Sequence, residues 1–352
     1  MAAPREPRSN MTMNLPMLPT TLIGSLPKPS WLTSEWYSVA GRWNLSGAAL
    51  AEAFDDATRV ALDAQLRAGI DIVCDGEQRR PSHFSYFLQQ LGGVDCERRH
   101  AKAMRGGQRT QEVPRVVGPV TLAAHHTLDD YRFLRRLTAC PVKATLPGPL
   151  TLVDGTFDES YGDERALGFA FADALNQELR ALQAAGCEMI QLDEPAVTRL
   201  PEKLHAWGVE ALDRAFDGIT ATRCVHVCYG YTKRAPGRKQ WRHGYEEIFP
   251  ALARARVDQY SLEFAEPKLP ARVLEGLPGK TIQIGVIHAG SDEVETPEAV
   301  AARLREALEV LPPERIVAAP DCGLGSLTRA SAQAKLNALV LGTKLVRAQL
   351  ER

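Results

Sequence analysis

The stretch Glu188-Met-Ile-Gln-Leu-Asp-Glu-Pro195 shows the pattern on which the fold prediction rests. A short apolar run ends abruptly in two carboxylates and a proline, and a helical pattern over residues 164–185 precedes it. A continuous apolar run next to such a pattern is typical of a parallel strand that is buried on both faces. Polar residues at the carboxyl end of such a strand are typical of a functional site.

The same pattern recurs along the chain. Short β-rich runs are expected to form eight strands, at residues 21–24, 70–74, 142–145, 188–192, 224–228, 259–262, 282–286 and 316–319. Helical patterns lie between them, for example at residues 50–68, 164–185, 296–310 and 331–350. Eight alternating units predict an α/β protein with a single (β/α)₈ TIM barrel, whereas fewer would suit an open doubly wound sheet.

One segment departs from this rhythm and predicts an insertion after the second strand. Residues 94–136 are about twice as many as one crossover connection needs. Gly106-Gly107 and the run from Glu112 to Val120 favour a β-hairpin, followed by a helix at about residues 128–137. The basic side chains of this segment are Arg98, Arg99, Lys102, Arg105 and Arg109. They suit a solvated surface loop, or else a lid or docking surface for an anionic donor.

The ends of the chain and its composition set further expectations. Residues 1–17 are expected to form a flexible leader, with Met11 or Met13 as alternative starts, and residues 18–352 the barrel. The formal net charge is -1, so no basic excess indicates nucleic acid as a partner. No apolar run approaches the roughly 18 residues that a membrane span needs, and the first ten residues lack a signal-peptide core. Seven scattered cysteines suit reduced thiols, so we expect a cytoplasmic protein without a membrane partner.

Candidate metal ligands gather at the predicted ends of three strands. His226 and Cys228 lie two apart on one strand, so both side chains point to the same face. A core histidine beside a buried cysteine would give the same pattern. Glu263 and Cys322 follow two other strands, where a carboxylate and a thiol are awkward without a partner or a metal. These are ligands that Zn²⁺ accepts, and a set drawn from several strands favours a catalytic site.

Carboxylates at the ends of the second and fourth strands form a second cluster of candidates. Asp75, Glu77, Asp193 and Glu194 could be salt-bridged structural residues, or could bind a cationic group such as an amine. Strand alternation predicts that Asp75 and Glu77 share a face, whereas Asp193 and Glu194 point apart. His288, at the end of the seventh strand, suits a proton relay, although it could simply form a hydrogen bond.

Together these motifs resemble the catalytic C-terminal barrel of the cobalamin-independent methionine synthase family, and more closely its single-barrel "core" members. The resemblance extends over almost the whole chain from about residue 18. The matching stretches are residues 21–25, 75–77, 146–151, 190–196, 226–228, 285–288 and 320–324. The resemblance implies a zinc-dependent methyltransferase that transfers a methyl group to the thiol of homocysteine and so forms methionine.

The resemblance also implies a role for each candidate residue. A Zn²⁺ cofactor would be held by His226, Cys228, Glu263 and Cys322. The metal would bind the homocysteine thiol and deprotonate it. Glu77 and Asp193 would hold the substrate ammonium, Ser25 its carboxylate, and catalytic His288 would assist protonation of the leaving group.

The chain departs from the family on the donor side. The long enzymes have an additional N-terminal barrel, for which we expect no counterpart within these 352 residues. The family has an aromatic residue for folate stacking after the Gly-Pro-Leu-Thr motif, whereas this chain has none until Phe157. The methyl donor is therefore either methyltetrahydrofolate or a methylcorrinoid, which could be bound to an accessory protein.

Two other functions remain open at this point. A zinc-dependent alkyltransferase for a thiol of the coenzyme M type would use the same metal ligands. Glu77 and Asp193 suit an ammonium group, however, and would repel a sulfonate. A non-catalytic, zinc-stabilised docking module for a corrinoid or redox partner is the third possibility, and the basic insertion is the feature that favours it.

Overall fold

The core of the protein is a parallel β-sheet. The computed structural model describes residues 14–34, 42–82, 84–104, 109–229 and 244–351. Six strands pair in the order β3-β5-β6-β7-β8-β9, and every pairing is parallel. The strands are β3 (Lys143–Pro147), β5 (Met189–Asp193), β6 (Thr222–Val227), β7 (Gln259–Leu262), β8 (Thr281–Ile287) and β9 (Ile316–Pro320).

Isolated bridges, rather than extended ladders, close this sheet into a ring. Thr20 pairs in parallel with Ala318 of β9, and Thr21 pairs with Ile72. Val73 then pairs with Val142, directly before β3. The segments expected at residues 21–24 and 70–74 therefore occupy the first two strand positions, but only as bridges. The prediction of a (β/α)₈ barrel is confirmed.

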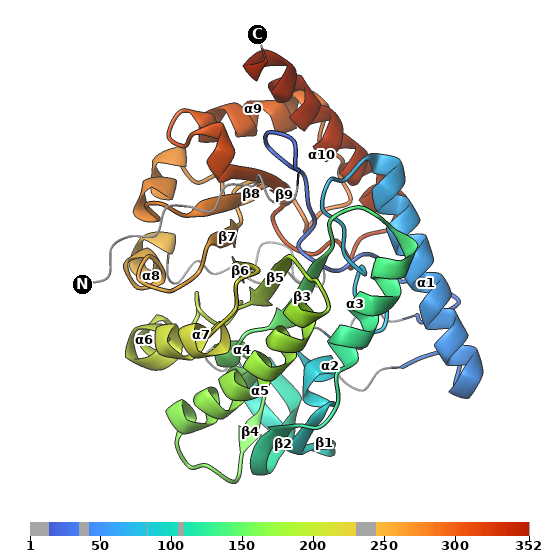
Figure 1. The fold of residues 1–352 in the computed structure, drawn as a ribbon, viewed down its shortest axis with the longest axis vertical. Coiled ribbons are helices and arrows are strands. Elements are labelled where there is room, and N and C mark those ends of the chain that lie inside the picture. The colour runs from blue at the N-terminus through green and yellow to red at the C-terminus, as the bar shows by residue number, and fades with distance from the viewer. Residues whose placement is uncertain (1–13, 35–41, 83, 105–108, 230–243, 352) are drawn as a thin grey trace.

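Helices surround the strands (Figure 1). The long ones are α1 (Gly47–Ala68), α3 (His126–Leu137), α5 (Glu164–Ala184), α9 (Pro297–Leu308) and α10 (Arg329–Leu350). Shorter helical elements are α2 (Ser85–Leu88), α4 (Pro149–Asp154), α6 (Pro201–Lys203), η2 (Leu204–Gly208), α7 (Val209–Ala215), α8 (Tyr245–Leu252), η3 (Ala271–Gly276) and η4 (Pro313–Arg315). Side-chain oxygens of Asp163, Thr296 and Thr328 cap α5, α9 and α10, as helix starts require. Within the described ranges, no helix is long and apolar enough to cross a bilayer.

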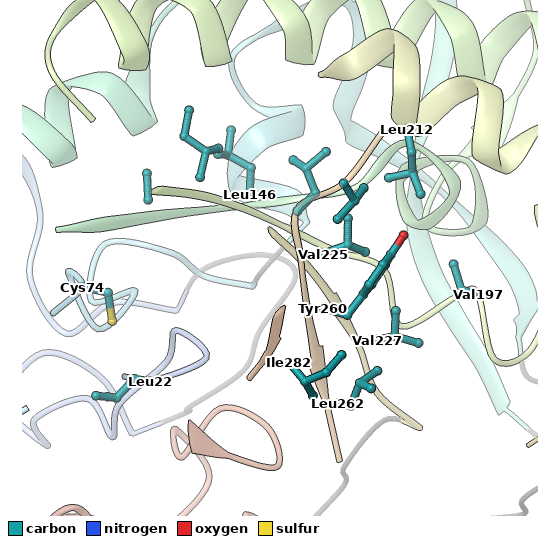
Figure 2. Close-up of a cluster of buried hydrophobic side chains, with 14 of the residues drawn as sticks. Leu22, Cys74, Leu146, Val197, Leu212, Val225, Val227, Tyr260, Leu262 and Ile282 are labelled. Atoms are coloured by element: carbon teal, nitrogen blue, oxygen red, sulfur yellow. The ribbon is translucent and has the colours of Figure 1, made fainter. Parts of the chain in front are cut away.

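The two faces of the barrel strands differ in polarity. Leu146, Val225, Tyr260 and Ile282 belong to the buried hydrophobic cluster drawn in Figure 2. The hydroxyl of Tyr260 donates to the carbonyl of Leu252 in α8, so this face points toward the helices. Alternation then directs the intervening residues into the barrel. Many of these inward residues are polar.

The expected insertion is present and forms a hairpin. β1 (Leu91–Met104) pairs antiparallel with β2 (Arg109–Leu122), with register shifts near Gly92 and Asp95. β2 also pairs in parallel with the short β4 (Phe157–Asp158), and α3 follows the hairpin as expected. The ammonium group of Lys102 donates to the carbonyls of Val153, Asp154 and Thr156, so this basic residue attaches the hairpin to the barrel. Arg105 and most of the expected leader lie outside the described residues.

Candidate active site

Two thiols and an imidazole meet at the carboxyl ends of the strands. His226 lies in β6, Cys228 follows β6 directly, and Cys322 follows β9. One ligand atom from each lies within 4.8 Å of the other two. Hydrogen bonding with Cys228, together with burial, raises the pKa of the Cys322 thiol well above its ordinary value. Buried thiols that crowd together in this way suit a cation that binds thiolates.

The imidazole of His226 is oriented for a ligand. Its Nδ1 lies 3.1 Å from Oγ of Ser261 in β7, which fixes the ring. Its Nε2 is buried, and no residue in the described part of the chain gives that atom a hydrogen bond. A buried polar atom without a partner is costly, whereas a metal-bound imidazole is commonly held through its other nitrogen. The donor set and this atom therefore fit a metal ion such as Zn²⁺.

Glu263 lies beside this group but is not a member of it. The side chain is fully buried directly after β7, and its Oε1 accepts a hydrogen bond of 3.2 Å from the amide of Tyr229. Hydrogen bonding with Cys228 and burial are the main causes of the raised pKa of the Cys322 thiol, and the charge of Glu263 adds to them. The structure thus brings three of the four predicted ligands together and leaves Glu263 adjacent to them.

Asp193 and Glu77 approach the same region from β5 and from the turn after the second strand position. Burial raises the pKa of Asp193 to about 7, and the nearby Glu77 carboxyl acts in the same direction. Burial also raises the pKa of Glu77, which the guanidinium of Arg80 opposes. Two buried carboxyls that repel one another favour a cation between them. An ammonium group is such a cation.

Glu77 is held in an unusual conformation. Its φ is 56°, which is uncommon outside glycine and often marks a functional position. Its Oε1 accepts from the hydroxyl of Thr145 at 3.4 Å and lies 3.8 Å from Nη1 of Arg80. A Cβ atom on Gly24 would lie only 2.1 Å from that oxygen. Glycine at position 24 is thus what allows the carboxylate to lie against the first strand position.

Two of the predicted carboxylates support the structure. Glu194 accepts hydrogen bonds from the amides of Leu150 and Thr151 at the start of α4. It therefore points away from Asp193, as alternation predicts. Asp75 lies 3.3 Å from Nη2 of Arg80 and accepts the amide of Glu77 at 3.0 Å. Asp75 and Glu77 do converge, but through a turn rather than through strand alternation.

Ser25 and His288 lie on the loops that border this group. A Cβ on Gly323 would lie 2.1 Å from Oγ of Ser25, so the serine hydroxyl is next to the loop that carries Cys322. The amide of His288 donates to Oε1 of Glu295 at 2.7 Å, and Lys335 holds the other carboxylate oxygen at 2.8 Å. This buried ion pair fixes the backbone of His288.

The sequence alone did not single out Arg80, Gln191, Ser261 or Asp321. Each supports a candidate residue, or the residue next to one, through a hydrogen bond or an ion pair. Gln191 donates from Nε2 to Oδ1 of Asp193 at 2.7 Å. Gln191 stands two positions before the strand-end carboxylate of Asp193, so both side chains lie on the inner face of β5. This spacing is the signal from which the contact could have been predicted. Taken together, the site offers thiol and imidazole groups on one side and buried carboxyl groups on the other. Such a site suits an amino acid that carries a thiol.

Comparison with known proteins shows which family this chain resembles. Residues 18–344 match the family model described as the catalytic domain of cobalamin-independent synthase. Methionine synthases of Saccharolobus solfataricus and Sulfurisphaera tokodaii are 34% and 33% identical, with 96% of this chain covered in both and 97% and 95% of theirs. A B12-independent methionine synthase from Shewanella sp. W3-18-1, solved with selenomethionine, superposes with a TM-score of 0.89 at 38% identity. That match covers 95% of this chain and 99% of the other.

Proposed function

Because the chain belongs to the cobalamin-independent synthase family through its catalytic domain, we propose that it methylates the thiol of homocysteine to form methionine. The observation that carries this proposal is the pairing of two features in one site. A group of His226, Cys228 and Cys322 that could hold a metal ion lies at the strand ends together with the buried carboxyls Glu77 and Asp193. Homocysteine carries the thiol and the ammonium group that these two features would bind.

His226, Cys228 and Cys322 would hold Zn²⁺, with Glu263 beside them as the fourth ligand. When bound, the ion supplies the Lewis acidity that keeps a substrate thiol deprotonated near neutral pH. The hydroxyl of Ser261 would fix the imidazole of His226 through Nδ1, so that Nε2 could bind the ion.

The other residues would orient the substrate. Glu77 and Asp193 would bind the ammonium group, and the hydroxyl of Ser25 would bind the carboxylate. A fixed amino-acid portion restricts where the sulfur can lie, which favours reaction with one donor carbon. His288, whose backbone is fixed by Glu295, would give a proton to the leaving group.

We infer that the donor is a methylated tetrahydrofolate. The relatives are named cobalamin-independent or B12-independent, which favours a methyl group on nitrogen over one on corrinoid cobalt. The sulfur would form a bond to the methyl carbon while the bond from that carbon to the folate nitrogen breaks. The nitrogen keeps the electron pair and takes up the proton.

The test offers the zinc-loaded protein homocysteine with methyltetrahydrofolate carrying a ¹³C-methyl group, or with methylcobalamin. We expect labelled methionine by mass spectrometry from the folate arm. Methionine from methylcobalamin alone would instead identify a corrinoid donor. No methionine from either donor, in protein with a full complement of zinc, would refute the proposed function. Replacing homocysteine by 2-mercaptoethanesulfonate tests the alternative of a coenzyme M type, and we expect no product.

A further inference from the structure

A layer of polar side chains crosses the inside of the barrel below the candidate site. We call it the core polar layer. Its members come from β3, β5, β6, β7 and β8, and they are Lys143, Gln191, Cys224, Gln259 and Gln283. All five are almost completely buried. Such a layer is unusual, because the interior of a barrel of this type is normally filled by branched apolar residues.

Lys143 is the cation of this layer, and all three of its ammonium protons are matched. Nζ donates to Oε1 of Gln191 at 2.7 Å and to Oε1 of Gln283 at 3.3 Å, and it also donates to the carbonyl of Leu22. A protonated lysine has three donors and no acceptor, so three acceptors suit it. Burying such a group is costly unless it is fully hydrogen-bonded, as it is here.

The lysine fixes which way the amide of Gln191 points. An amide has an acceptor oxygen and a donor nitrogen that differ little in shape, so its orientation depends on its neighbours. Because Oε1 is held by Lys143, Nε2 must face the other side. There it donates to Oδ1 of Asp193 at 2.7 Å and to the carbonyl of Ile23 at 2.9 Å.

We propose that Lys143 is a positioning residue for the substrate ammonium group, acting through Gln191 on Asp193. The inference rests on the proposed function, since it takes Asp193 as a ligand of the homocysteine ammonium. Lys143 does not touch the substrate. It orients the Gln191 amide so that Nε2 donates a hydrogen bond to one oxygen of Asp193. This bond restricts the rotation of the carboxylate. A carboxylate held in this way meets the ammonium group already oriented, so binding does not have to order it.

The test measures discrimination between two thiols. Homocysteine and 4-mercaptobutanoate share the thiol and the carboxylate and differ in the amino group. The ratio of their kcat/KM values therefore reports binding of the ammonium group alone. We expect Lys143→Met, whose unbranched side chain is one atom shorter, to reduce this ratio about tenfold. A reduction of this size is on the scale of losing one hydrogen bond to a charged group. Zinc content should stay equal to that of the unaltered protein.

A matched control separates positioning from general damage. Lys102 also donates to three carbonyl oxygens, but it lies in the hairpin and has no bond to Gln191 or Asp193. Lys102→Met should therefore leave the thiol ratio unchanged. A merely structural role of Lys143 would lower activity with both thiols alike and leave the ratio as it was, and that result would overturn the proposal.

A second variant tests the route. Gln191→Met removes the donor to Asp193, and it should lower the ratio as far as Lys143→Met does. If Lys143 acts through Gln191, the double variant should be no worse than either single one, whereas independent effects would multiply. If the two effects multiply, Lys143 does not act through Gln191, and that part of the proposal is overturned. If Lys143→Met fails to fold, an unchanged ratio in Gln191→Met overturns the proposal on its own. Failure of the unaltered protein to methylate homocysteine at all would instead refute the proposed function.

Discussion

The carboxylate of Asp321 accepts a hydrogen bond of 2.8 Å from the backbone amide of Phe264. The same oxygen accepts the amide of Ala265, and the other accepts the amide of Glu266, both at 2.8 Å. The residue directly before Cys322 therefore fixes the turn directly after Glu263. Two candidate metal ligands on different strands are held in one arrangement by a single buried side chain.

Replacing Asp321 by Ala should disturb both the fold and the metal site. Loss of bonds from three amides to a carboxylate should lower the free energy of unfolding by about 3 kcal/mol, measured by urea denaturation. Zinc affinity, measured by competition with a chelator, should fall about tenfold to a hundredfold. Asp158 also accepts three amides, in β4 away from the site, so Asp158→Ala is the control. It should lower stability and leave zinc affinity unchanged, and an equal loss of zinc in both variants would contradict the argument.

Cys322→Ser should remove both zinc and activity. A serine hydroxyl is a far poorer ligand than a thiolate, because it keeps its proton near neutral pH. The measurement is metal content by mass spectrometry, together with methionine formation. Cys140 is only partly buried and lies outside the ligand group, so Cys140→Ser should retain both. Full activity in Cys322→Ser without bound zinc would refute the metal site.

Gly24→Ala should weaken homocysteine binding. The new Cβ would lie 2.1 Å from Oε1 of Glu77, so the carboxylate would have to move. We expect kcat/KM for homocysteine to fall about tenfold or more, since small displacements in a site have effects of this size. Gly118→Ala in the hairpin is the matched control, because there the nearest atom lies at 3.8 Å. Unaltered kinetics in Gly24→Ala would show that Glu77 takes no part in binding.

Arg80→Met should change the pH dependence of activity. Burial raises the pKa of Glu77, and Arg80 opposes that rise. Without the guanidinium the pKa should rise further, so Glu77 would become protonated at a higher pH. The acid limb of the profile of kcat/KM against pH should therefore move to higher pH. Arg79 pairs with Asp55 and Asp130 instead, so Arg79→Met should leave this limb in place. A limb that does not move in Arg80→Met would contradict the role of Glu77.

Arg347→Met should destabilise the closure of the barrel. Its guanidinium donates to the carbonyls of Met17 and Leu18 and to the carboxylate of Asp71, at 2.7, 2.9 and 2.5 Å. These contacts join α10 to the first two strand positions of the barrel, which pair with their neighbours only through isolated bridges. We expect a loss of about 2 kcal/mol in the free energy of unfolding. Arg305→Met, which loses an exposed bond to Gln349, should lose much less, and equal losses would contradict this account.

Most of the fold could be predicted because the strands are apolar on their outer face and the helices are amphipathic. The expected strand at residues 259–262 coincides with β7, and the expected helix at 164–185 with α5 to within one residue. The first two strand positions were predicted longer than they are. Thr20, at the first strand position, is held by the side chain of Asp71 as well as by backbone pairing. Strand propensity is a property of single residues and does not predict such a contact.

The sequence by itself determined which residues stand at the strand ends, since a period of two and a break in hydrophobicity are local properties. It therefore indicates His226, Cys228, Glu263 and Cys322 as candidate ligands at one end of the barrel. Only the tertiary structure decided what holds them and the carboxylates in place. The bond from the Phe264 amide to Asp321 and the bond from Lys143 to Gln191 join segments far apart in the chain. Such bonds depend on the distance and direction between two groups in space, and neither can be predicted from their spacing along the chain.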